Sequence, residues 1–144
     1  MGVVSPIGND VEQVWDSVQH ARCGIGEITH FDASDFRAKL AGEVKNLDME
    51  QYFTKRDLKF NDRFTQFTRI AAKQAYENSG LQDASFNRDR FGVIIGSGIG
   101  GIATIEGASQ TIESRGPSRI SPYFIPMSLI NLAAGSAAID MEAH

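Results

Sequence analysis

The sequence predicts an α/β fold, and two features lead to this prediction. Residues 91–95 form a short apolar run with β-branched side chains between turn residues, which favours a buried strand over a helix. Amphipathic segments lie on both sides of it, over about 62–78 and about 102–116. Strands that alternate with helices along the chain are typical of α/β proteins.

The first predicted element is a helix that follows Asn9. Four apolar side chains recur at the spacing of one helical face: Val11, Val14, Trp15 and Val18. Asn9, with Glu12 three positions later, has the form of a capping box, which would start the helix there. After this helix, residues 25–36 are expected to form a loop, and residues 39–44 alternate weakly, as a short strand does.

The second predicted helix covers about residues 62–78. One face carries four apolar side chains and a neighbouring tyrosine: Phe64, Phe67, Ala71, Ala75 and Tyr76. Gly80 stands where a glycine commonly ends a helix. Residues 81–90 are polar and are expected to connect this helix to the strand at 91–95.

Two further helices are predicted after residue 101. The first of them stops at Gly116 and has three apolar positions: Ile102, Ile105 and Ile112. An irregular loop is expected over 116–122. Pro126 fits the first turn of the last helix. Because that helix is apolar nearly all round, it is expected to be buried on most sides.

Between the predicted strand and the next helix, Gly96, Gly98 and Gly101 match the pattern G-x-G-x-x-G. In this position the pattern can hold the pyrophosphate of a dinucleotide, so an NAD(P)-binding oxidoreductase module is one alternative function. That fingerprint also needs a second strand with an acidic end about 20 residues on, where this chain has the turn residues 116–119. The simpler interpretation is a tight turn whose glycines let the backbone approach another element closely.

Composition and charge narrow the function classes. Hydrophobic residues make up 42% and charged residues 22%, as in a single globular domain. The net charge is −4 without a long basic run, so nucleic-acid binding is not expected. The longest strongly apolar stretch, 127–139, is too short and too rich in small residues for membrane insertion. Cys23 is the only cysteine and no signal peptide follows Met1, which favours a cytoplasmic protein.

The residues alone predict no catalytic or metal-binding constellation. Cys23 follows the end of a helix, which has the wrong polarity to activate a thiolate. His20, His30 and His144 are scattered and lack partners at metal-ligand spacing, so no metal site is expected. The mixed-charge run at 55–59 is most simply a solvated face. The chain begins and ends within motifs, so we expect it to be a piece of a longer protein.

Seven segments, in order along the chain, resemble the β-ketoacyl-[acyl carrier protein] synthases of type II. They are Ser5-Pro6-Ile7-Gly8-Asn9, His30-Phe31-Asp32, 62–67, Asn78-Ser79-Gly80-Leu81, 95–101, 120–126 and 131–135. The glycine turn followed by Ile-Ser-Pro-Tyr-Phe-Ile-Pro, at this separation, is the most specific part. The resemblance extends over essentially all residues from 1 to 144.

This resemblance implies a thiolase-like fold, layered αβαβα in the full-length protein, and a homodimer. Residues 1–144 would form part of the N-terminal half, without its first strand and without the catalytic C-terminal portion. In that family a cysteine receives the acyl group, malonyl-acyl carrier protein is decarboxylated, and its carbanion attacks the thioester in fatty-acid elongation. The partner is acyl carrier protein and no cofactor takes part. No catalytic residue falls within this chain, so the chain by itself is expected to be inactive.

The resemblance also implies site residues for the acyl chain. Ile99, between Gly98 and Gly100, matches the residue that gates the acyl tunnel, so the groups expected to approach the glycine turn are an acyl chain and a partner subunit. Three residues match the segment that reaches across the dimer to form the floor of the partner's pocket: Phe124, Ile125 and Ser128.

A second implied site contacts the acidic carrier protein, which a basic patch would attract. Arg56, Lys59 and Arg119 match or neighbour the family positions that make this contact. Phe60 and Ser118 stand where members often have basic residues. A polyketide ketosynthase or a chain-length factor remains the nearest alternative, and a non-catalytic interaction module is a third.

Overall fold

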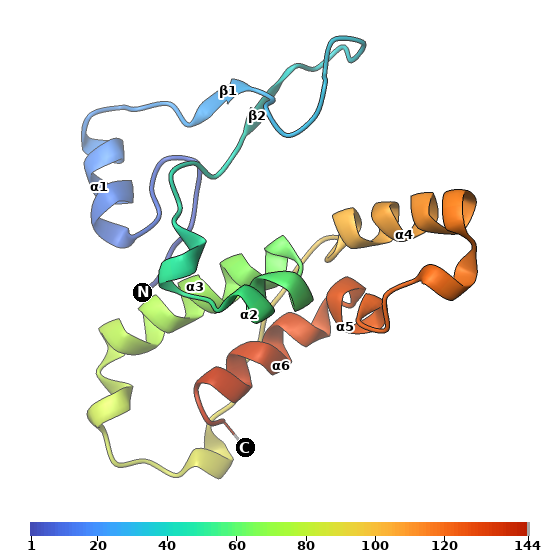
Figure 1. Cartoon of the computed structure of the whole chain (residues 1–144). Helices are drawn as coiled ribbons and strands as arrows, with labels where there is room; N and C mark the ends of the chain where they lie inside the picture. The colour runs from blue at the N-terminus through green and yellow to red at the C-terminus, as the bar shows by residue number, and fades with distance from the viewer. Residues whose placement is uncertain (144) are drawn as a thin grey trace.

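The structure is a computed structural model that describes residues 1–143 (Figure 1). His144, one of the histidines considered for a metal site, lies outside the described residues. The main elements are α1 (Val11–Gln19), β1 (Ile25–Glu27), β2 (Leu40–Gly42), α2 (Lys55–Phe60), α3 (Arg63–Ser79), α4 (Ile102–Arg115), α5 (Phe124–Ser128) and α6 (Asn131–Asp140). Single 3₁₀ turns lie between them: η1 (Met49–Gln51), η2 (Leu81–Asp83), η3 (Arg88–Arg90) and η4 (Pro117–Arg119).

The core forms where α3 and α6 run side by side in the middle of the molecule (Figure 1). The helix predicted at 62–78 is confirmed, and Gly80 ends it in the left-handed conformation, with φ 70°. Ile70 of α3 is fully buried, as are Ala133 and Ala137 of α6, whose small side chains allow close packing. The other buried residues of α3 are Thr65 and Gln66, so the buried face is rotated from the predicted one.

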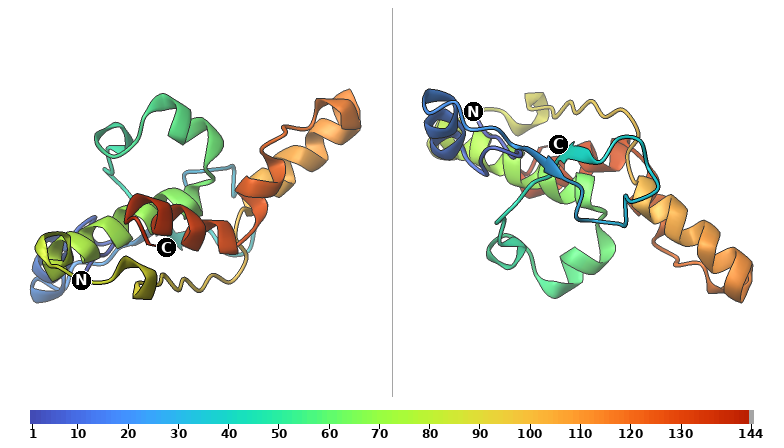
Figure 2. Two further views of the ribbon diagram at one scale, coloured as in Figure 1. Left: turned by 90° about the horizontal axis from the view of Figure 1, so that it is seen from below. Right: turned by 90° about the horizontal axis from the view of Figure 1, so that it is seen from above.

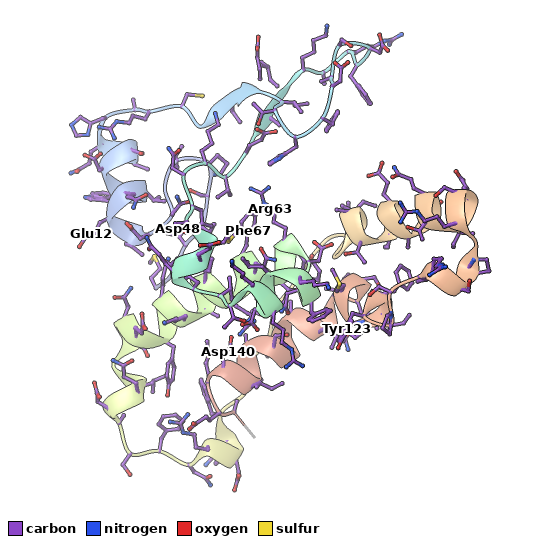
Figure 3. The ribbon with its side chains drawn as sticks, in the orientation of Figure 1. Glu12, Asp48, Arg63, Phe67, Tyr123 and Asp140 are labelled. Carbon is purple, nitrogen blue, oxygen red and sulfur yellow. The ribbon has the colours of Figure 1, made fainter. Side chains whose placement is uncertain are left out.

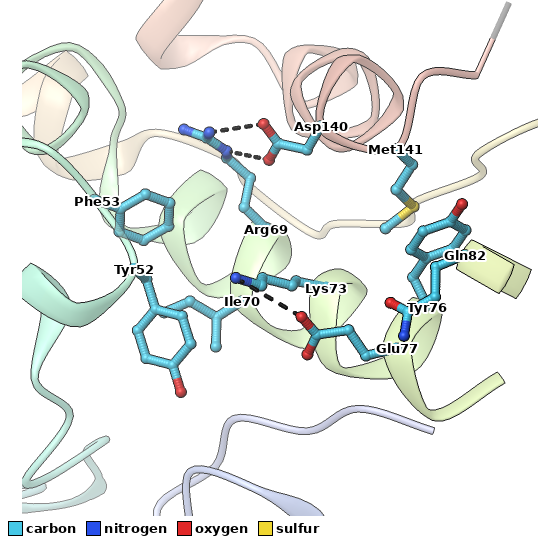
Figure 4. A pocket seen from close by; sticks show the side chains of 10 residues that line it. All are labelled: Tyr52, Phe53, Arg69, Ile70, Lys73, Tyr76, Glu77, Gln82, Asp140 and Met141. Atoms are coloured by element: carbon cyan, nitrogen blue, oxygen red, sulfur yellow. Dashed lines mark hydrogen bonds and ion pairs between the residues drawn. The ribbon is translucent and has the colours of Figure 1, made fainter. Parts of the chain in front are cut away.

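Arg69 of α3 links this helix to α6 and to α2; Figure 4 shows its pair with Asp140 of α6. Its Nε and Nη2 donate to the two carboxylate oxygens of Asp140 at 2.6 and 2.8 Å, and its Nη1 lies 3.5 Å from Asp57 Oδ1. The guanidinium also lies 4.9 Å from the ring centre of Phe53, beside a cavity of about 370 Å³. The Asp140 carboxylate raises the pKa of Arg69, and the Thr54 hydroxyl lowers the pKa of Asp57.

The first helix begins one residue later than predicted. Asp10, not Asn9, caps α1, because its carboxylate accepts from the backbone N–H of Gln13 at 2.7 Å. The Asn9 side chain instead donates to the carbonyl of Lys45 at 2.8 Å, a partner distant in sequence. The predicted apolar face exists, but Trp15 and Val18 on it are exposed.

Residues 25–36 were predicted to be loop, and this is wrong for the first three. β1 pairs antiparallel with β2, with Ile25 opposite Gly42 and Glu27 opposite Leu40. The strand predicted within 39–44 is confirmed as β2. Glu43, just after β2, links to the loop that follows β1, because its carboxylate accepts from the N–H and hydroxyl of Thr29 at 2.9 and 2.7 Å. The Thr29 hydroxyl is the largest cause that lowers the pKa of Glu43.

The buried strand predicted at residues 91–95 is not present. This segment forms an open connector between η3 and the glycine turn, and the Ile94 side chain is 97% exposed. Within the described residues the sheet has only the strands β1 and β2. A strand needs a neighbour for its backbone hydrogen bonds, and its apolar pattern alone does not supply one.

The helix α4 projects from the body of the molecule, and the chain returns along it through η4 and α5 (Figure 2). As predicted, α4 ends at Gly116. The last predicted helix is in fact two helices, which break at Leu129–Ile130. It is not buried on most sides, since Ile125, Leu129 and Ile139 are exposed. No helix among residues 1–143 is long and apolar enough to cross a membrane.

Candidate functional site

The glycine turn packs directly against the end of α5. The backbone N–H of Gly101 donates to the Ser128 carbonyl at 3.2 Å. A Cβ atom on Gly101 would lie 2.2 Å from the carbonyl oxygen of Met127, and Gly100 has a φ of 81°. A close approach is confirmed for Gly100 and Gly101, where the approaching backbone is that of α5 in the same chain. The expected approach of an acyl chain and a partner subunit stays a prediction.

One carboxylate fixes this turn to the core. Asp62 Oδ1 accepts from the N–H of Phe64 at 3.4 Å and so caps α3. Asp62 Oδ2 accepts from the N–H and the hydroxyl of Thr104, at 3.2 and 2.5 Å. Because α4 has no side-chain cap of its own at Gly101, Asp62 supplies that cap from another helix. With only 8% of its surface exposed, Asp62 joins two helix N-termini.

These hydrogen bonds argue against the alternative function of NAD(P) binding. A pyrophosphate at this turn would need free backbone N–H groups at the start of α4. Here Gly101 donates to Ser128, Ile102 donates to the Gly100 carbonyl, and Thr104 donates to Asp62. Three N–H groups at the start of α4 are thus engaged within the chain, one of them by a carboxylate, which disfavours a phosphate there.

The two sides of the turn differ in packing. A Cβ at Gly96 or Gly98 would meet nothing within 4 Å, and the Ile99 side chain is 65% exposed. Ile125, on the first turn of α5, is 56% exposed, and the Ser128 hydroxyl donates to its carbonyl at 3.2 Å. The turn thus presents Ile99 outward from a backbone that is fixed on its other side.

A groove of about 300 Å³ lies between α4 and the returning segment. It brings together two cationic side chains, Lys59 from α2 and Arg119 from η4, that are far apart in sequence. Hydroxyl and apolar groups complete the lining, among them Thr104, Thr111, Ser121, Phe124 and Met127. Arg56 lies on the same helix as Lys59 but outside this lining. Such a groove suits an anionic partner that also carries an apolar part.

An aromatic pair stands beside this groove. The rings of Phe60, the last residue of α2, and Tyr123, just before α5, have centroids 3.9 Å apart and planes inclined by 33°. Figure 3 shows Tyr123 at the start of α5, close to the end of α2. The Lys59 ammonium lies 5.5 Å from the centre of the Phe60 ring.

The sequence is similar to known proteins along nearly its whole length. The family model described as the β-ketoacyl synthase N-terminal domain matches residues 1–144. The chain belongs to the β-ketoacyl synthase family. It is 43% identical over 139 residues to the 3-oxoacyl-[acyl-carrier-protein] synthase 2 of Vibrio cholerae, and 41% identical over 143 residues to that of Staphylococcus aureus. The matches cover 96% and 99% of this chain but only 34% and 36% of the relatives.

Solved ketosynthases share the fold of this chain. One is a type II polyketide synthase acyl-carrier protein in complex with its ketosynthase, with a TM-score of 0.78 at 19% identity over 99% of this chain and 37% of that chain. Another is the ishigamide ketosynthase/chain length factor, with a TM-score of 0.78 at 23% identity. That match covers 97% of this chain and 35% of that chain. The thiolase-like α/β fold expected from the sequence is therefore confirmed.

Sequence reasoning missed the residues that organise the glycine turn. Asp62 is recognisable as a helix start, but its second partner, Thr104, lies 42 positions away. The stack of Phe60 on Tyr123 had no signal in the sequence either. Among residues 1–143 no group of three or more His, Cys, Asp or Glu side chains could hold a metal ion, and Cys23 is exposed.

Proposed function

We propose that this chain is the N-terminal part of a 3-oxoacyl-[acyl carrier protein] synthase. Such an enzyme joins an acyl thioester to the carbanion left when malonyl-acyl carrier protein loses CO₂, which lengthens the acyl chain by two carbons. The observation that carries the proposal is the identity of 41–43% to two proteins of that name along nearly the whole chain. We also propose a cytoplasmic location, since the only cysteine, Cys23, is an exposed free thiol.

The acyl chain is proposed to bind at the open side of the glycine turn. Gly100 and Gly101 hold the turn against α5, so Ile99 is presented from a fixed backbone. Phe124, Ile125 and Ser128 are proposed to close the pocket of a second subunit. The exposure of Ile99 and Ile125 supports this, because large apolar side chains gain by being covered.

The carrier protein is proposed to dock along α2 and η4. Lys59 and Arg119 line one groove, and Arg56 extends the positive charge along α2. An acidic partner would be attracted by these groups, mainly through a faster association rate. The solved ketosynthase in complex with its acyl-carrier protein shares this fold, which is consistent with such a partner.

A polyketide ketosynthase or chain-length factor is the second candidate. Two solved proteins of this kind have the same fold, but at only 19% and 23% identity. The higher identity to the fatty-acid type is the reason to prefer the synthase.

The test is a condensation assay with the full-length protein that carries this chain. The enzyme is given malonyl-acyl carrier protein and saturated acyl-acyl carrier proteins, and the products are measured by mass spectrometry. We expect a 3-oxoacyl product two carbons longer, with release of CO₂. Extension of polyketide intermediates alone would favour the second candidate, and release of no CO₂ with any acyl donor would contradict both enzymes.

A further inference from the structure

We infer that Phe60 and Tyr123 are positioning residues that hold the cationic end of α2 beside the segment entering α5. The inference rests on the proposed function, since the surface they organise is the one proposed for the carrier protein. It goes beyond that proposal because neither ring is a charged contact. Their role is to fix the positions of the two cationic side chains in the groove, Lys59 and Arg119.

The stack adds a direct contact between two parts of the molecule whose polar contacts run to other elements. The polar contacts of α2 run to α3: Gln66 Nε2 donates to the Leu58 and Asn61 carbonyls at 3.3 and 2.8 Å, and Arg69 pairs with Asp57. The returning segment is fastened instead to α4, through η4 and α5. The ring contact, with centroids 3.9 Å apart, links the end of α2 directly to that returning segment.

The position of Lys59 depends on the same ring. Its ammonium lies 5.5 Å from the Phe60 ring centre, within the range of a cation–π attraction. Lys59 also lines the groove that contains Arg119. Loss of the Phe60 ring would therefore remove this contact from the Lys59 ammonium, while the bonds from α2 to α3 remain.

A fixed pair of charges suits a folded acidic partner. Ordering a long, flexible side chain on binding costs free energy, and a surface arranged beforehand avoids part of that cost. With Lys59 and Arg119 held in one groove, an acidic helix or loop of the carrier protein meets both at once. A small thioester without the protein would gain nothing from this arrangement.

The test compares two acyl donors in the full-length synthase: an acyl-acyl carrier protein and the corresponding acyl-pantetheine. We expect Phe60→Ala to raise KM for the carrier-bound donor about fivefold, the scale of one aromatic pair. Its kcat, and KM for acyl-pantetheine, should stay within about twofold of the parent. Phe60→Leu retains most of the volume and should raise the same KM, so the test does not depend on folding of the alanine variant.

Three further variants sharpen the comparison. Tyr123→Phe keeps the ring and should keep the parent KM. The double variant Phe60→Ala/Tyr123→Ala should be no worse than the more impaired single variant, since both remove one contact. Phe86→Ala removes a different aromatic pair, with Phe91, whose centroids are 5.4 Å apart, and should leave both KM values unchanged.

The outcomes separate the inference from the proposed function. If Lys59→Ala raises KM for the carrier-bound donor but Phe60→Ala and Phe60→Leu do not, the positioning role is wrong and the docking surface stands. An equal rise of KM for both donors in the Phe60 variants would show a general structural defect and also overturn the inference. If neither Lys59→Ala nor Arg119→Ala affects the carrier-bound donor, the docking proposal itself fails.

Discussion

Asp62 caps two helices at once, because its carboxylate accepts from Phe64 at the start of α3 and from Thr104 in the first turn of α4. These bonds lie next to the contact between Gly101 and Ser128. The glycine turn is therefore held both by a side chain from the core and by the backbone of α5.

Removal of this double cap should destabilise the protein. We expect Asp62→Ala to lower the free energy of unfolding by about 2 kcal/mol, because buried hydrogen bonds to a charged group are lost at two helix ends. Thr104→Val should cost about 1 kcal/mol, since the N–H of residue 104 can still donate. Denaturant titration measures both values. Strictly additive effects in the double variant would contradict a shared interaction.

Substitution of Gly101 should be far more damaging than substitution of Gly98. A Cβ on Gly101 would stand 2.2 Å from the Met127 carbonyl oxygen, whereas nothing lies within 4 Å of a Cβ on Gly98. We expect Gly101→Ala to cost about 2 kcal/mol or more through forced separation of the turn and α5. Gly98→Ala should change the free energy of unfolding by less than about 0.5 kcal/mol. Equal losses in the two variants would argue against the close approach.

Chain-length preference should change with Ile99. In the full-length synthase we expect Ile99→Phe to confine activity to short acyl donors, because a rigid ring fills space that an isoleucine can vacate by changing rotamer. Ile99→Val is the matched control and should still accept long chains. The measurement is kcat/KM for a series of acyl-acyl carrier proteins whose acyl chains increase in length. An unchanged profile in Ile99→Phe would rule out a gating role for this residue.

Arg69 should contribute more to stability than an exposed lysine on the same helix. Its side chain is only 16% exposed and makes a bidentate pair with Asp140. We expect Arg69→Leu to cost about 2 kcal/mol, because Asp140 and Asp57 lose their partner. Lys73→Ala breaks the exposed pair with Glu77, at 3.7 Å, and should cost less than about 0.5 kcal/mol. Thermal and denaturant unfolding of the two variants gives the comparison.

Acid should loosen the hairpin through Glu43. The Thr29 hydroxyl and backbone hold the pKa of Glu43 below its ordinary value of 4.5. A lowered pKa in the folded state means that the stabilisation is present above the ordinary value and is lost as the pH falls through the folded-state pKa. We therefore expect a loss of stability below about pH 4.5. Asp57, whose pKa is also lowered, acts in the same direction.

The variant Glu43→Gln tests this assignment. It should show a lower free energy of unfolding at neutral pH and a shallower loss in acid, measured by denaturant unfolding between pH 7 and pH 3.5. Glu113→Gln, on the exposed face of α4, should keep the acid dependence of the parent. A parent-like acid loss in Glu43→Gln would mean that other groups cause it.

Features that depend on neighbouring residues could be predicted from the amino-acid sequence alone. The helix over 62–78 was predictable because its apolar spacing, its start at Asp62 and its stop at Gly80 act within a few residues of one another. The strand within 39–44 and the end of α4 at Gly116 were also predictable, because they too depend on residues close together in the sequence. The glycine pattern also predicted a close backbone approach, which a missing side chain allows whatever the partner.

Contacts between residues that are distant in the sequence depend on how the helices and loops pack. Residues 91–95 have a strand pattern, but a ladder needs a second strand, and the described residues offer none beside them. Asn9 is a residue type that often caps helices, but its side chain donates to the Lys45 carbonyl, and Asp10 caps α1 instead. The cap from Asp62 to Thr104 and the stack of Phe60 on Tyr123 join residues 42 and 63 positions apart. Local spacing carries no information about such contacts, because they form only when the helices pack.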